Sequence, residues 1–304
     1  MRHKKILVGS RNSQLAVAQT QIVMNEIKKH NPELELELLT YTTTGDRILD
    51  RSLDEVGGKG LFVKELDKAL IDGQIHIAVH SLKDMPMEEN RDLPIVSLYK
   101  RGDPRDVLVL PKSRKTTEDM DWYAFLNGLE RVGSSSARRQ LQIKKRYSGI
   151  GIKGVRGNII TRLQKLDQGE FDALVLAAAG LDRVGLTSRI NRYFSVEEII
   201  PAAGQGILSI QARSDLDISF LEQVNDEDTV YAATAERTFV RVLDGGCSSP
   251  IAAYAEVSGN DLKLTGLYYN EETKEHIIDY IAGNKESAEK LGFLLADRLK
   301  GALK

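Results

Sequence analysis

A single cysteine, Cys247, is present among the 304 residues, in a turn where Gly245 and Gly246 precede it and Ser248-Ser249-Pro250 follows it. One cysteine alone cannot form an intramolecular disulfide or a cysteine-rich metal cluster. Its thiolate, however, is the strongest side-chain nucleophile available near neutral pH. Two interpretations stay open from this position alone. Cys247 is either a point of covalent attachment or, as most free cysteines are, a small buried hydrophobic residue.

A second feature is a set of loops that combine cations with hydroxyl groups. Each follows a predicted strand or opens a predicted helix, and ligands of open α/β sheets bind outside the carboxyl ends of the strands. The first amides of a helix are unpaired, and an arginine fork holds a carboxylate through two hydrogen bonds, so these loops predict a ligand with several carboxylates or phosphates. The loops are 10–13 with Arg11 and Ser13, 80–86 with Ser81, Lys83 and Asp84, 133–139 with Ser134, Ser136, Arg138 and Arg139, and 155–158 with Arg156, ahead of a helix that carries Arg162.

Asp84 is the carboxylate of the 80–86 loop, and its position in the sequence supports two interpretations about equally. In a cation-rich site it is held ionised and can contact a donor or a positively charged intermediate. Alternatively, it forms a surface pair with Lys83, worth at most about 1 kcal/mol. His80 is a weak candidate for a base acting on Cys247, because it ends an apolar alternation and is expected to be a core histidine. No metal site is predicted, since the five histidines lack ligand spacing.

Strands and helices alternate along the first 200 residues, which predicts an α/β fold with parallel sheets covered by helices. After Pro201 the pattern changes, and 207–210 is expected to be a strand that returns to the first sheet. The tail is typical of a small α+β domain. Strands are expected at 5–9, 34–38, 75–79, 106–110, 131–132, 150–152, 173–176, 262–264 and 277–278, and helices from Ser13 and Ser136, near 61–70, and over 158–168, 229–243 and 288–303.

The segment 99–104 is a plausible crossing between two β/α domains. We therefore expect domain 1 to comprise residues 1–99 with about 201–222, domain 2 residues 105–200, and domain 3 residues 223–304. The glycine-rich segment 45–60 suits a mobile lid better than a packed connection. The candidate lid residues are Lys59, which lies within this segment, and Phe62, which follows the segment.

The bulk composition is that of a soluble globular protein, with 41% hydrophobic and 28% charged residues. At 33.8 kDa the chain is too long for one ordinary core, so two or three domains are expected. The 42 basic and 44 acidic residues argue against a general nucleic-acid binder. No apolar run approaches the roughly 20 residues of a membrane span, and no apolar signal segment opens the chain, so a cytoplasmic protein is expected.

Several long segments, in the same order along the chain, resemble one enzyme family, porphobilinogen deaminase, also called hydroxymethylbilane synthase. The match covers nearly the whole sequence. The segments that carry it are 56–65 (VGGKGLFVKE), 78–84 (AVHSLKD), 133–139 (GSSSARR), 156–158 (RGN), 176–180 (LAAAG), 201–206 (PAAGQG), 235–237 (AER) and 245–247 (GGC).

The resemblance implies a transferase that condenses four porphobilinogen molecules head to tail, releases ammonia each time, and frees the linear tetrapyrrole by hydrolysis. It implies a dipyrromethane cofactor joined to Cys247 by a thioether, and Asp84 as the catalytic carboxylate that stabilises an azafulvene-type cation. It also implies a monomer with three domains, of which the first two are doubly wound like periplasmic binding proteins. The third is the small α+β domain with the cofactor cysteine.

The resemblance further implies which side chains bind the acetate and propionate arms. Those on the cofactor side are Lys83, Ser81, Ser134, Ser136, Arg138, Arg139 and Arg162, and those on the substrate side are Arg11, Ser13, Arg156, Arg162 and Arg183. The chain departs from the common family pattern at Asn12, Gln14, Thr44, Ser134 and Ser248-Ser249. Two other functions stay open, a two-lobed polycarboxylate-binding protein without turnover and a cysteine hydrolase.

Overall fold

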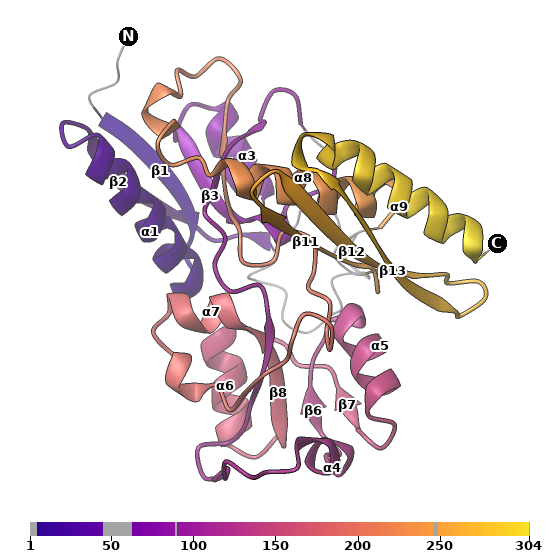
Figure 1. The fold of residues 1–304 in the computed structure, drawn as a ribbon. Helices are drawn as coiled ribbons and strands as arrows, with labels where there is room; N and C mark the ends of the chain where they lie inside the picture. The colour runs from indigo at the N-terminus through magenta and orange to yellow at the C-terminus, as the bar shows by residue number, and fades with distance from the viewer. Residues whose placement is uncertain (1–4, 45–62, 89, 246–248, 304) are drawn as a thin grey trace.

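The computed structural model describes residues 5–44, 63–88, 90–245 and 249–303. Over these residues the chain forms two lobes, each built on a five-stranded sheet, and a third unit built on a three-stranded sheet (Figure 1). This arrangement confirms the α/β class with two doubly wound lobes and a small α+β unit. No described helix combines the length and the apolar composition that a membrane span requires.

The first lobe has the strand order β2-β1-β3-β10-β4. Its two faces are both covered, because alternate residues of a strand point to opposite sides. Val8 packs in the cluster beneath α1, whereas Leu7 packs in the cluster beneath α3. The elements are β1 (Lys5–Arg11), α1 (Gln14–His30), β2 (Glu35–Tyr41), α3 (Lys64–Ile71), β3 (Ile77–Ser81), β4 (Ile95–Tyr99) and β10 (Leu208–Ala212).

The second lobe has the strand order β7-β6-β8-β5-β9 and repeats the design. Leu108 packs among residues of α4 and α5, and its neighbour Val107 packs among residues of α6 and α7 on the other face. The elements are β5 (Asp106–Val109), α4 (Trp122–Asn127), β6 (Val132–Gly133), α5 (Ala137–Arg146), β7 (Ile152–Lys153), α6 (Ile159–Asp167), β8 (Ala173–Ala177), α7 (Ala178–Arg183) and β9 (Arg192–Tyr193).

Each of the two sheets contains a strand that enters directly from the other lobe. β5 runs antiparallel to β8 and β9, and β10 runs antiparallel to β3 and β4. The predicted parallel pairing is present between β1 and its neighbours β2 and β3 and between β6 and its neighbours β7 and β8, and the two crossing strands make each sheet mixed. Each crossing strand begins beside the carboxyl end of a strand of the sheet that it enters, Asp106 opposite Ala177 and Leu208 opposite Ser81, so it runs in the opposite direction. The prediction that 207–210 returns to the first sheet is confirmed.

The third unit packs two helices on one face of an antiparallel sheet. Asp226 caps the first helix by accepting a hydrogen bond from the Thr229 amide. The helices approach closely at Gly292, where a Cβ would lie 2.5 Å from the Ala235 carbonyl oxygen. The elements are α8 (Glu227–Val242), β11 (Ala252–Ser258), β12 (Asp261–Tyr269), β13 (His276–Asn284) and α9 (Ala288–Ala302), and short 3₁₀ turns lie at Leu82–Asp84, Thr187–Arg189, Ser219–Leu221 and Lys285–Ser287.

Candidate active site

Asp84 lies in a 3₁₀ turn at the carboxyl end of β3. The turn is anchored by Leu82, whose side chain is buried and whose amide donates to the Ile207 carbonyl at 3.0 Å. Asp84 itself is exposed, and its carboxylate makes no hydrogen bond or ion pair with any described residue. A rigid turn therefore presents a carboxylate that is open to a ligand.

Lys83 precedes Asp84 and points toward the second lobe. Its ammonium donates to Gln205 Oε1 at 3.3 Å. Burial is the main cause that lowers the pKa of Lys83 to about 8, and the guanidinium groups of Arg139 and Arg138 lower it further. Asp84 and Asp106 oppose this shift. Lys83 is therefore mostly a cation at pH 7, and it loses its charge as the pH rises through about 8.

Arg138 and Arg139 converge on one fully buried carboxylate, Asp106. Arg139 donates to Asp106 Oδ1 from Nε at 3.0 Å and Nη2 at 2.7 Å, and Arg138 Nη1 lies 2.8 Å from Oδ2. Burial alone would raise the pKa of Asp106, but the two guanidinium groups outweigh it and hold that pKa well below its usual range. Two of the three arginines assigned to the cofactor side, Arg138 and Arg139, thus share one internal carboxylate.

Arg162 connects the second lobe electrostatically to Asp84 in the first. Its Nε donates to the Gly157 carbonyl at 2.8 Å. Burial, followed by the charges of Arg139 and Arg156, lowers the pKa of Arg162 to about 10, and Asp84 opposes the shift. Arg156 is half-buried and makes no hydrogen bond or ion pair within the described ranges. The structure therefore gathers Asp84 and these cations in one place.

The predicted serines lie at element ends near these cations. Ser81 closes β3, and its hydroxyl accepts from Gln19 Nε2 at 2.9 Å. Ser134 is buried after β6, and its hydroxyl accepts from the Ser136 amide at 3.4 Å. Ser136 precedes the first turn of α5, and its own hydroxyl makes no cap with that helix. Each of the three hydroxyls keeps its O–H donor, since Ser81 and Ser134 only accept in these contacts.

Arg11, Ser13 and Arg183 have different surroundings. Arg11 lies close enough to His80 for its charge to lower the pKa of that imidazole. The Ser13 hydroxyl caps α1 by accepting from the Ala16 amide at 3.3 Å. Arg183 donates to the Gly206 carbonyl at 2.5 Å, at the crossing between lobes, and burial lowers its pKa to about 10. No contact among the described residues joins Arg183 to Asp84.

One further sequence prediction, for His80, is confirmed, and the predictions for three other residues cannot be compared with the structure. His80 is buried, and burial lowers its pKa to about 4, which confirms a neutral core histidine. Cys247, Lys59 and Phe62 lie outside the described residues.

The sequence analysis missed three charged or polar residues that hold the lobes together. Glu236 is fully buried on α8, and Arg101 Nη1 lies 2.6 Å from its Oε1. The amides of Gly204 and Ala255 each donate to the same carboxylate at 2.7 Å. The other two are Asp106 and Gln205. Glu236 and Gln205 fall within segments 235–237 and 201–206, which the sequence analysis had already singled out. The presence of a polar side chain in each of these segments could have marked the two residues as structurally important.

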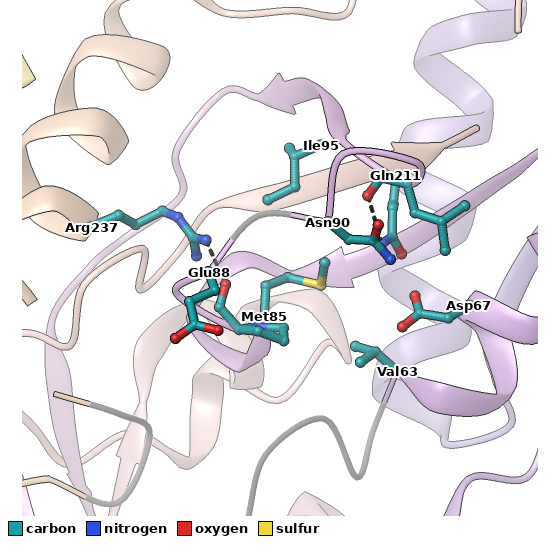
Figure 2. Close-up of a pocket in the computed structure, with 10 residues that line it drawn as sticks. Val63, Asp67, Met85, Glu88, Asn90, Ile95, Gln211 and Arg237 are labelled. Carbon is teal, nitrogen blue, oxygen red and sulfur yellow. Dashed lines mark hydrogen bonds between the residues drawn. The ribbon is translucent and has the colours of Figure 1, made fainter. Parts of the chain in front are cut away.

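A pocket lies behind the turn that carries Asp84, with Met85 and Glu88 on its wall (Figure 2). Arg237 reaches from α8 and donates to the Pro86 carbonyl at 2.6 Å. Asp84, Lys83, Arg156 and Arg162 do not line this pocket. Its lining residues are Val63, Asp67, Met85, Pro86, Glu88, Asn90, Leu93, Ile95, Gln211 and Arg237.

The sequence is similar to proteins of one family along nearly its whole length. Residues 6–219 match the family model described as porphobilinogen deaminase, dipyromethane cofactor binding domain, and residues 230–301 match its C-terminal domain. The chain is 51% identical to the porphobilinogen deaminase of Ruminiclostridium josui and 52% identical to that of Acetivibrio thermocellus, in each case over 98% of this chain and 99% of the relative. The relative from Brevibacillus brevis is 44% identical, over 96% of this chain and 93% of its own length.

Among solved structures, the periplasmic aliphatic sulphonate binding protein SsuA from Escherichia coli overlaps 78% of this chain and 70% of its own, with a TM-score of 0.41 and 14% identity. The family models together span both lobes and the third unit, and the relatives match almost end to end. The chain therefore belongs to the porphobilinogen deaminase family.

Proposed function

We propose that this chain is a porphobilinogen deaminase of tetrapyrrole biosynthesis. It joins four porphobilinogen molecules head to tail, releases one ammonia at each addition, and frees hydroxymethylbilane by hydrolysis. One observation carries the assignment to this site, the exposed and unpaired Asp84 carboxylate among Lys83, Arg162 and Arg156. Each pyrrole ring brings two carboxylates and one N–H donor, and this arrangement offers a partner for both kinds of group.

The same residues suit a dipyrromethane, which is the cofactor of this family. Its carboxylate arms need cations and hydroxyl donors, and Lys83, Arg162 and Ser136 provide them. Its ring N–H groups need an acceptor, and Asp84 is the carboxylate without an internal partner. When bound, the cofactor supplies the primer end to which the first substrate is joined. Cys247, outside the described residues, would hold it through a thioether.

Within this function, Asp84 accepts hydrogen bonds from pyrrole N–H groups and stabilises the positive charge that develops on the substrate as ammonia leaves. The surrounding cations bind the acetate and propionate arms and fix the ring relative to Asp84. A polycarboxylate-binding protein without turnover is not favoured. The relatives, at 50–52% identity over nearly the whole chain, are named as deaminases.

We also propose the division into domain 1 (residues 1–99 with about 201–222), domain 2 (105–200) and domain 3 (223–304). Its support is that β10 pairs within the first sheet, and that the two family models meet between residues 219 and 230. A cytoplasmic monomer is the proposed form. The lone Cys247 thiol suits a reducing compartment, and one chain provides every cation and carboxylate of the site.

The intact mass of the purified active protein is expected to exceed its sequence mass by one dipyrromethane, because Cys247 would carry the cofactor covalently. Electrospray mass spectrometry under denaturing conditions measures this, and iodoacetamide should fail to alkylate the loaded chain. Cys247→Ser is the control and should have the mass of its bare sequence. A fully active wild-type protein at its bare sequence mass would refute the covalent cofactor.

Arg156→Leu is expected to raise KM roughly 10- to 100-fold, the effect of one lost charge-assisted hydrogen bond to a carboxylate. The urea midpoint should not move, since Arg156 makes no ion pair with the described residues. Lys144→Leu removes an exposed cation from α5 of the same lobe and serves as the control. Equal effects of the two substitutions on KM would show that Arg156 acts only through the positive electrostatic potential of the lobe and not through a contact with the substrate.

A further inference from the structure

The Gln205 side chain joins the two lobes at the site. Gln205 is buried in the segment that returns the chain from the second lobe to the first. Its Nε2 donates to the Pro104 carbonyl at 2.6 Å and to Asp106 Oδ1 at 2.9 Å. Since both Nε2 hydrogens have acceptors, the amide oxygen must point the other way. There it accepts from Lys83 Nζ at 3.3 Å.

The Asp106 carboxylate, which accepts a hydrogen bond from the Gln205 amide, is also held in place by several contacts. Asp106 is fully buried at the start of β5, and its two oxygens face Arg138, Arg139 and Gln205. The guanidinium groups are held in turn by backbone carbonyls, Arg138 by Ile200 at 2.6 Å and Arg139 by Val175 at 3.1 Å. Asp106 therefore cannot move without disturbing three side chains.

We propose that Asp106 is a positioning residue for the Lys83 ammonium of the opposite lobe, acting through the Gln205 amide. Asp106 neutralises part of the charge of the two arginines and orients the amide whose oxygen receives Lys83. Lys83 is thereby held next to Asp84 although it lies close to two guanidinium groups that repel it. The value of this device for catalysis rests on the proposed function, but the coupling itself does not.

The coupling predicts the direction in which the pKa of Lys83 changes in two variants. The charged groups that act on Lys83 include Asp84, Arg139, Asp106 and Arg138, and Gln205 is in hydrogen-bond contact with it. Asp106→Asn removes a negative neighbour and leaves two guanidinium charges unopposed, so the pKa of Lys83 should fall by about one unit. Arg139→Gln removes one of the guanidinium charges that lower the pKa of Lys83, while Arg138 still pairs with Asp106, so it should raise that pKa by a similar amount.

The test is a titration of Lys83 in the full-length chain with the Cys247→Ser substitution, so that no bound carboxylates contribute. Trace labelling with acetic anhydride between pH 6 and 10, read from the Lys83 peptide by mass spectrometry, measures the pKa. Asp103→Asn is the matched control. Its carboxylate lies in the same crossing segment but pairs with Arg105 at 2.6 Å, so the pKa of Lys83 should stay unchanged.

Opposite shifts in the two variants, with no shift in the control, support the proposal. Shifts of the same sign, or none, overturn it, because a purely structural role would not reverse with the charge. Arg139→Gln leaves Asp106 paired with Arg138, so it decides the question if Asp106→Asn does not fold. In the loaded enzyme, the alkaline limb of kcat/KM should move with the pKa of Lys83. A limb that stays in place while the labelling shifts would count against Lys83 as a ligand-binding group, and leave the coupling intact.

Discussion

Asp84→Asn is expected to lower kcat by roughly 10²- to 10³-fold, the usual effect of removing one preorganised group that stabilises transition-state charge. The amide keeps the size of the side chain but carries no charge, and its NH₂ group would face the pyrrole N–H donors. KM should change much less, because the cations that bind the carboxylate arms are untouched. Steady-state kinetics with porphobilinogen measures both constants.

The control for this experiment is Asp103→Asn, which removes a carboxylate that is part-buried and paired with Arg105. It should leave kcat nearly unchanged. The intact mass of Asp84→Asn must also be measured, because loss of the cofactor would lower the rate for a different reason. A cofactor-loaded Asp84→Asn protein with a near-normal rate would exclude Asp84 from the chemistry.

Glu236→Gln is expected to lower the free energy of unfolding by about 3–5 kcal/mol, the cost of leaving a buried charge without its partner. All four contacts to the Glu236 carboxylate are donors, two from Arg101 and one each from the Gly204 and Ala255 amides. An amide can accept at one end only, so its NH₂ group would face donors. Urea unfolding followed by circular dichroism measures the loss.

Glu289→Gln is the matched control, because Glu289 also pairs with an α8 arginine, Arg241, at 3.1 Å but is largely exposed. Its effect on the free energy of unfolding should stay below about 1 kcal/mol. If Glu236→Gln were as mild as this control, the buried pair would not be what holds α8 to the crossing segments.

The local elements of the site could be predicted from the sequence. The helix expected over 158–168 is α6 at Ile159–Asp167, and the one expected over 229–243 is α8 at Glu227–Val242. The position of Asp84 just after a buried strand was also predicted. These features depend on side-chain periodicity within a few residues, and that periodicity can be read directly from the chain.

The direction of the two crossing strands could not be predicted in this way. The apolar patterns of β5 and β10 do not reveal it, because β5 is an apolar run like β8, and β10 alternates apolar and polar residues like the parallel strand β2. Their antiparallel direction follows from where the chain enters each sheet, which is a property of the whole connection. The pairing of Glu236 with Arg101 has the same origin, since 135 positions separate the two residues.

By itself the sequence determined which chemical groups stand at the strand ends, namely loops rich in cations and one carboxylate, Asp84. Only the tertiary structure decided which of those cations are neutralised internally and which face outward. Arg138 and Arg139 pair with Asp106, while Arg156 has no such partner among the described residues. The physical reason is that electrostatic energy depends on distance in space and on burial, and the packing of two lobes sets both.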